Sequence, residues 1–199
     1  MVVFRLLLYS GLVANVLSIS DRAEFRAWLF LHASKEKEGW VIAPRLRPGT
    51  VPFTYLDAVE EALCFGWIDS VYKNIDGVFY QRFSPRKKNS PWTELNKERA
   101  RRLIKLGLMT KEGKKVLPPL GPRSYPLDAT VIKRLKEARV YSKFKAFPPL
   151  YQRIRVYNVA FYRHRDKQTY DAALAHLIEK TKKGEMFGEW NDYGRLLDY

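Results

Sequence analysis

The chain has 199 residues, of which 46% are hydrophobic and 14% aromatic, so it can form a core without disulfide bonds or structural metal ions. Its single cysteine, Cys64, excludes an internal disulfide bond and favours a cytoplasmic location. The formal net charge of +15 makes an acidic partner more favourable than a basic one.

The positive charge is concentrated in the second part of the chain. Residues 1–80 carry 8 Lys and Arg against 9 Asp and Glu, whereas residues 81–199 carry 28 against 12. A field of this size attracts polyanions and accelerates encounter with them. We therefore expect an anionic ligand or polyanion as partner, which leaves nucleic acid, an anionic membrane surface and acidic proteins open.

The first 17 residues resemble a secretory signal peptide only in part. Arg5 precedes apolar runs at 6–8 and 12–17, but polar residues and a glycine interrupt them, and no small-residue cleavage site follows. The stretch is also too short to span a bilayer. We predict an N-terminal extension over residues 1–17 and no integral membrane segment, with export as the open alternative to the cytoplasm.

A helix and a short strand are expected next. Asp21 followed by Glu24 is a capping-box-like start, and apolar residues then recur at helical spacing, which predicts a helix over 22–33. The apolar segment 39–43 predicts a short buried strand. Three prolines between residues 44 and 52 predict a loop.

A second helix and a β-hairpin follow this loop. Thr54 with Asp57 predicts an N-cap, and the helix ends at Gly66. Residues 67–72 and 78–83 have strand composition, and Asp76-Gly77 between them is a favoured hairpin turn. These signals together predict one antiparallel hairpin.

The next segment begins with a basic loop over residues 84–90. Ser90 as cap and Pro91 at the first helical position predict a helix that reaches Gly107, and Thr110 predicts a cap for one further short turn. The proline-rich segment 118–122 is the expected boundary between subdomains.

The remainder of the chain is predicted to be helical, and the whole to be an α+β protein. Helices are expected over these ranges, the last two as an antiparallel pair: 128–139, 141–147, 148–163 and 169–183. We predict a helix-strand-helix-β-hairpin-helix core over 18–117, with a helical segment over 123–184 packed on it and a tail over 185–199.

Several of these segments resemble a known family. The resemblance is carried by residues 24–28, 54–70, 80–86, 90–92, 96–99 and 107–109, and more loosely by 148–183. In this order they are similar to the bacteriocin-protection, YdeI/OmpD-associated (OmdA-like) family. Residues 1–17, the proline-rich loop 42–54 and the segment 118–126 depart from the family pattern. The resemblance implies a role in stress or antimicrobial-peptide protection, and it implies no catalytic residues.

Cys64 and Asp69 lie where the second helix meets the hairpin, so a nucleophile or general base is conceivable there. Such chemistry needs a partner, and no spacing connects Cys64 to His32, His164 or His176. A buried structural cysteine and a hydrogen-bonded aspartate are the favoured interpretation. No ligand spacing for a metal and no glycine-rich nucleotide loop is present, so no cofactor is expected.

The favoured candidate site is an anion-binding basic pocket beside the hairpin. Residues 81–115 hold 12 Lys and Arg against 3 Asp and Glu. Guanidinium groups bind phosphate or carboxylate as a fork, and a neighbouring aromatic ring can stack on a base. The predicted binding residues are Asp69, Gln81, Arg82, Arg86, Lys87, Trp92 and Asn96.

Simpler interpretations of the same residues remain open. Arg82 could pair with Asp69 across the hairpin, Trp92 could belong to the core, and the remaining cations could form an ordinary basic surface. Residues 151–165 also predict an amphipathic basic helix, which is either a binding surface or a core helix.

The resemblance implies a role in stress or antimicrobial-peptide protection, and together with the basic residues beside the hairpin it favours a non-enzymatic role that acts through an anion-binding basic pocket. Nucleic-acid binding is the first alternative. A small-molecule enzyme that uses Asp69 and Cys64 is the second. The sequence does not set the oligomeric state.

Overall fold

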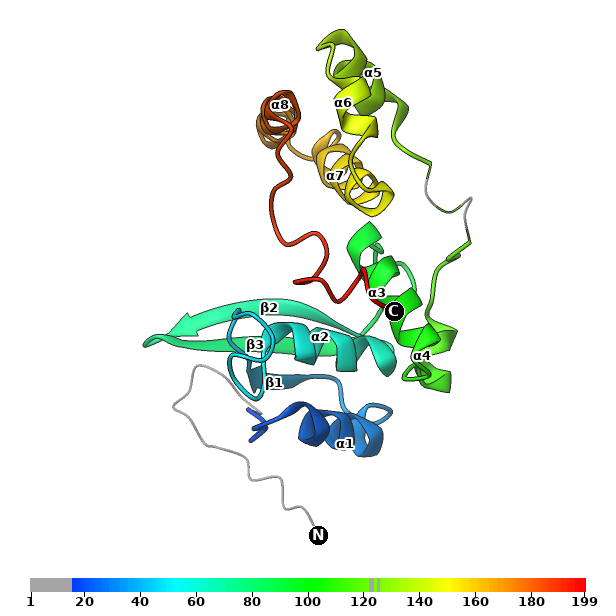
Figure 1. Ribbon diagram of the computed structural model, residues 1–199. Coiled ribbons are helices and arrows are strands. Elements are labelled where there is room, and N and C mark those ends of the chain that lie inside the picture. The colour runs from blue at the N-terminus through cyan, green and yellow to red at the C-terminus, as the bar shows by residue number, and fades with distance from the viewer. Residues whose placement is uncertain (1–15, 122–123, 125) are drawn as a thin grey trace. The chain divides into compact units, whose positions relative to one another are not determined.

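The computed structural model describes residues 16–121, 124 and 126–199 (Figure 1). The chain divides into two compact units, one made of residues 1–90 and 100–117 and the other of 91–99 and 118–199. Helices contain 46% and strands 13% of the described residues, which confirms the predicted α+β class. The extension predicted over 1–17 lies outside the described residues except for Val16 and Leu17, which are buried.

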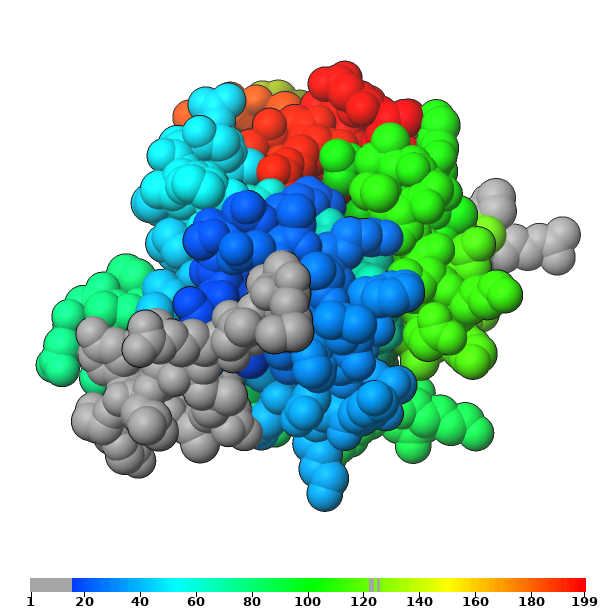
Figure 2. Space-filling view, turned by 90° about the horizontal axis from the view of Figure 1, so that it is seen from below, coloured from blue at the N-terminus to red at the C-terminus, as the bar shows by residue number. Residues whose placement is uncertain are grey.

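The first unit contains the predicted order of helices and strands. Its elements are α1 (Arg22–His32), β1 (Gly39–Ile42), α2 (Tyr55–Cys64), β2 (Trp67–Ile75), β3 (Val78–Pro85), the second half of α3 (Glu94–Lys105) and α4 (Lys111–Lys115). Figure 2 shows the chain around α1, in blue, at the surface of this unit. Within the described ranges, no helix is long and apolar enough to cross a membrane.

Local signals set the ends of several elements. Asp21 accepts a hydrogen bond from the backbone N–H of Glu24, and Thr54 forms a complete capping box with Asp57, so both predicted N-caps are confirmed. Asp76 and Gly77 have φ angles of 51° and 80°, as a tight turn between antiparallel strands requires.

The start of α3 differs from the prediction. The helix begins at Glu94, so Ser90 and Pro91 lie before it. Thr93 Oγ1 accepts a hydrogen bond from the backbone N–H of Asn96 at 3.1 Å. Thr93 is also a favoured capping residue, and it fixes the helix start three residues later.

The sheet has the order β1-β3-β2 with all pairs antiparallel. Asp69 lies opposite Phe83, and Tyr72 lies opposite Gln81, so a β-bulge separates these two pairs. The face that carries Phe83 packs against α1, where the rings of Phe25 and Phe83 are 5.5 Å apart. Helix α2 also packs against β2 (Figure 1).

A buried ion network joins three helices of the first unit. Glu60 and Glu61 on α2 are almost completely buried. Arg22 on α1 donates to Glu60 at 2.7 Å and to Glu61 at 2.5 Å, and Arg26 donates to Glu61 at 2.6 Å. Arg102 on α3 donates to the second oxygen of Glu60 at 2.8 Å. Two carboxylates therefore hold α1 and α3 against α2.

Helix α4 approaches the end of α2 closely. Thr110 donates hydrogen bonds from its backbone N–H and its hydroxyl to the carbonyl oxygen of Cys64, at 3.1 and 2.6 Å. A Cβ atom on Gly113 would lie 2.2 Å from the same oxygen. Only glycine fits there without moving one of the helices.

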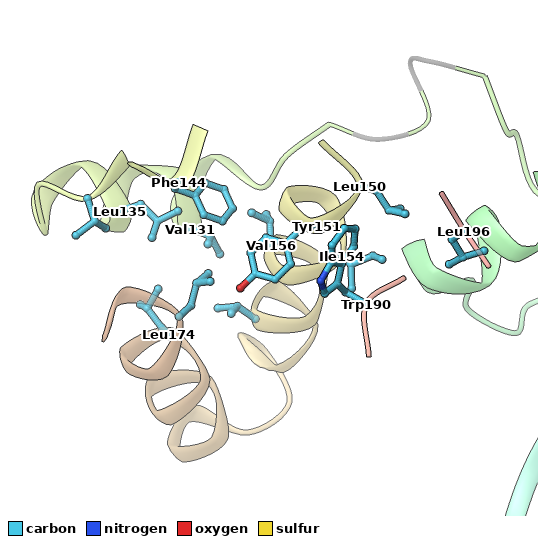
Figure 3. Packing of buried hydrophobic residues seen from close by; sticks show 13 residues of the cluster. Val131, Leu135, Phe144, Leu150, Tyr151, Ile154, Val156, Leu174, Trp190 and Leu196 are labelled. Carbon is cyan, nitrogen blue, oxygen red and sulfur yellow. The ribbon is translucent and has the colours of Figure 1, made fainter. Parts of the chain in front are cut away.

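The second unit is helical apart from its C-terminal segment. It contains the first turns of α3 with α5 (Ala129–Glu137), α6 (Tyr141–Lys145), α7 (Pro149–Tyr162) and α8 (Lys167–Lys183). Figure 3 shows its core, in which Tyr151 packs edge-on against Trp190 with ring centroids 5.6 Å apart. Trp190 and Leu196 of the C-terminal segment are buried in this core.

Charged residues at the start of α3 tie it to the rest of the second unit. Arg99 binds the carboxylate of Asp192 through two hydrogen bonds of 2.7 and 2.8 Å. Glu98 accepts hydrogen bonds from Arg153 at 3.0 Å and from the Tyr199 hydroxyl at 2.8 Å. This unit is consequently assembled from two separate stretches of sequence.

We predict that Glu60→Gln lowers the free energy of unfolding by about 3 kcal/mol, because it leaves Arg22 and Arg102 half-buried beside an uncharged group. Urea denaturation followed by circular dichroism measures the change. The control is Glu112→Gln, which removes an exposed carboxylate of the same unit and should change stability by less than about 0.5 kcal/mol. Equal effects of the two substitutions would contradict a stabilising network.

Candidate functional site

The seven residues predicted to bind an anion are distributed over both units. Asp69, Gln81, Arg82, Arg86 and Lys87 belong to the first unit, and Trp92 and Asn96 to the second. Within the second unit, Trp92 is half-buried, and the buried Asn96 accepts a hydrogen bond from Arg99 at 2.8 Å.

Arg82 lies on the opposite face of the hairpin from Asp69. Neighbouring residues of a strand point to opposite faces, and Asp69 is aligned with Phe83. Arg82 instead donates to Glu38 at 2.7 Å and to the Ser70 hydroxyl at 3.1 Å. The hydrogen bond from Arg82 lowers the pKa of Glu38 although burial opposes it. The suggested pairing of Arg82 with Asp69 is therefore wrong.

On the other face, Asp69 belongs to a cluster that includes residues absent from the prediction. The Tyr55 hydroxyl, at the start of α2, donates to Asp69 Oδ2 at 2.8 Å. The guanidinium of Arg45 lies 4.4 Å from the ring centroid of Tyr55 and 4.6 Å from that of Tyr72. An arginine is thus placed between two tyrosine rings.

Arg86 adds a buried cation close to this cluster. Burial lowers the pKa of Arg86 to about 10, and the negative charge of Asp69 partly offsets the lowering. Its backbone N–H donates to the carbonyl of Gly66 at 2.9 Å, which holds the end of β3 at the start of β2. Lys87, the next residue, is exposed.

Gln81 supplies a buried acceptor on the same face. Its amide nitrogen donates to the carbonyls of Val71 and Arg82 at 3.0 and 3.2 Å. Its Oε1 atom is buried and accepts no hydrogen bond within the part of the chain that the structure describes. An acceptor left in this state is uncommon and marks a place where a donor can bind.

We call Arg45, Tyr55, Asp69, Tyr72 and Arg86 the hairpin cluster. It combines two guanidinium groups with one carboxylate and two aromatic rings. Tyr72 is 39% exposed, although Phe79 stacks on its ring at 5.6 Å and the Arg45 guanidinium lies over the ring at 4.6 Å. Chemically, the cluster can bind an anionic group at the arginines, and the exposed part of Tyr72 can contact an aromatic group of the ligand edge-on.

No local sequence signal indicated Arg45, Tyr55 and Tyr72. Asp69 and Tyr72 are three residues apart, which in a regular strand places them on opposite faces. The β-bulge between them brings both to one face. Arg45 follows a proline in a loop, where its position depends on the fold alone.

The described residues give no support to a metal centre, since they contain no group of three or more His, Cys, Asp and Glu side chains placed to hold an ion. Cys64 is completely buried. Burial raises the pKa of its thiol to about 12, assisted by the negative charge of Glu61. This environment favours the structural interpretation of Cys64.

The basic helix expected over 151–165 is α7 of the second unit, and its arginines contact other residues of that unit. Arg153 pairs with Glu98, and Arg163 binds both oxygens of Asp128 at 2.8 Å. Arg155 lies 4.2 Å from the ring centroid of Phe187. The helix contributes Tyr151 and Ile154 to the core (Figure 3), so it is a core helix.

Residues 17–116 match the family described as Domain of unknown function (DUF8412), and the chain belongs to this family. No curated protein and no solved structure matches the chain. The matched segment contains the complete hairpin cluster and the buried ion network of the first unit. The helices α5 to α8 lie outside it.

We predict that Cys64 in the folded protein reacts with the thiol reagent DTNB at pH 8 about 1,000-fold more slowly than an ordinary cysteine, because so little thiolate is present. Absorbance at 412 nm follows the reaction. The same sample in denaturing urea should react at the ordinary rate. Fast reaction without denaturant would restore Cys64 as a candidate nucleophile.

Proposed function

We propose that this protein is a non-enzymatic binding protein of the YdeI/OmpD-associated type, and that its hairpin cluster recognises an anionic ligand. The observation that carries the proposal is the placement of Arg45 between the rings of Tyr55 and Tyr72, with Asp69 and the buried Arg86 beside them. Arginine held by aromatic rings is pre-oriented for a carboxylate or phosphate.

The charges of the hairpin cluster support an anion over a cation. The cluster contains two guanidinium groups and one carboxylate, and that carboxylate already accepts a hydrogen bond from the Tyr55 hydroxyl. Arg86 is buried with a pKa lowered by desolvation, so a negative group placed beside it gains a strong interaction. Lys87 and Lys88 follow directly and extend the positive charge.

The net charge also restricts how a protective role could operate. A protein of charge +15 repels cationic antimicrobial peptides, so direct capture of such a peptide is unfavourable. We propose that any protection acts through an anionic molecule that the protein binds. Tyr72, which is 39% exposed beside Arg45, favours an anion that also contains a planar ring able to contact the tyrosine edge-on, such as a nucleotide.

Titration calorimetry with ADP tests the proposal. We expect Arg45→Ala to weaken ADP binding about tenfold, because it removes a pre-oriented cation from the cluster. Arg47→Ala is the matched control, since it removes the same charge from an exposed position two residues along the same loop, and it should weaken binding less than threefold. Equal weakening by both variants, or no ADP binding to the wild type, would contradict recognition of nucleotides at the cluster.

Single-stranded nucleic acid is a second candidate, and the stacked pair Tyr72 and Phe79 favours it. Aromatic side chains next to cations bind successive bases, and Arg45 provides a cation beside the ring of Tyr72.

For this candidate we predict that Tyr72→Ala weakens binding of a labelled oligo(dT) by about 5- to 100-fold in fluorescence anisotropy, at both about 0.05 and about 0.2 M salt. Tyr193→Ala removes a ring of equal exposure, 39%, from the second unit and should leave binding unchanged. Binding that disappears at the higher salt and is insensitive to Tyr72 would identify charge attraction without base stacking.

A further inference from the structure

We propose that the second unit contains a binding site for a small, uncharged organic molecule that donates a hydrogen bond. The site is a cavity of about 530 Å³ between the start of α3, the start of α5 and the middle of α7. Its lining includes Glu94, Lys97, Leu127, Asp128, Val156 and Tyr157. The volume is within the range of cavities that hold metabolite-sized ligands.

The charged groups of the lining are already paired within the unit. Lys97 donates to Glu94 Oε1 at 2.6 Å and to the carbonyl of Ser124 at 3.3 Å. Both oxygens of Asp128 accept from Arg163 at 2.8 Å, and one also caps α5. Arg153 pairs with Glu98 at 3.0 Å. Because positive and negative groups balance, the cavity has no excess charge to attract an ion.

The second carboxylate oxygen of Glu94 differs from these groups. Glu94 is only 7% exposed, and its Oε2 atom is buried and accepts no hydrogen bond from the described residues. A buried carboxylate oxygen without a donor costs free energy, and a ligand N–H or O–H group would recover it. The polar group of the ligand should therefore be a hydrogen-bond donor that binds Glu94 Oε2.

The remaining lining provides an apolar surface. Leu127, Val156 and Ala160 contribute aliphatic side chains, and Tyr157 contributes a ring. Burial raises the pKa of Tyr157, the charge of Arg165 opposes this and the charge of Glu94 adds to it, so the phenol stays protonated and neutral. A ligand with an apolar body can therefore replace water along most of the cavity.

Both kinds of ion are disfavoured in this cavity. An amine would meet Lys97 and Arg153 in a protein of net charge +15. A carboxylate would meet the unpartnered oxygen of Glu94 and the carboxylate of Asp128. An amide or alcohol satisfies the acceptor without either repulsion.

Four molecules with one phenylpropyl-type skeleton test the proposal: 3-phenylpropanamide, its methyl ester analogue, 3-phenylpropylamine and 3-phenylpropanoate. Molecules of this size bind a formed pocket in about the millimolar range, which saturation-transfer NMR detects. We expect the amide to bind at least five times more tightly than the other three. Tighter binding of the amine or the carboxylate, or no binding by any of them at millimolar concentration, would overturn the proposal.

A matched pair of variants places the binding in the cavity. Ala160→Phe fills the cavity and should abolish amide binding, whereas Ala172→Phe adds the same side chain at an exposed position of α8 and should leave binding unchanged. Circular dichroism verifies that both variants are folded. Unchanged binding to a folded Ala160→Phe variant would refute the site. The inference is independent of the hairpin cluster, because Arg45→Ala should not affect amide binding.

Discussion

The first unit depends on two buried carboxylates. Glu60 and Glu61 face into the protein from α2, and desolvating them is favourable only because arginines from α1 and α3 bind them directly. Apolar packing alone is non-directional and would allow these helices to slide against one another. Because arginines from both α1 and α3 bind these carboxylates, α2 cannot shift along its axis. The position at which α2 begins is therefore fixed as well.

That position matters for the hairpin cluster. Tyr55 is the first residue of α2, and its hydroxyl reaches Asp69 on β2. A displacement of the helix by a fraction of a turn would break this hydrogen bond and open the space that Arg45 occupies. The buried ion network therefore determines the position of Tyr55 in the hairpin cluster, and the side chains of the hairpin cluster determine what it can bind.

Features with local causes could be predicted from the sequence. The capping box at Thr54 and the Asp76-Gly77 turn involve residues within four positions of each other, and both are present. Features that depend on distant segments could not. Glu38 became the partner of Arg82 because β1 pairs with β3, and Tyr72 joined Asp69 because a bulge changed the register. The predicted site thus included Asp69 and Arg86 but omitted their aromatic neighbours.

The division of helix α3 between the two units limits how this architecture could evolve. Its first turns supply Glu98 and Arg99 to the second unit, while its last turns supply Arg102 to the first. A gene fragment that begins after Leu117 would encode a helical bundle lacking the residues that neutralise Asp192 and Arg153. Such a fragment would carry these two charges into its core without their partners, so recombination that keeps residues 91–99 with the second unit disturbs it less.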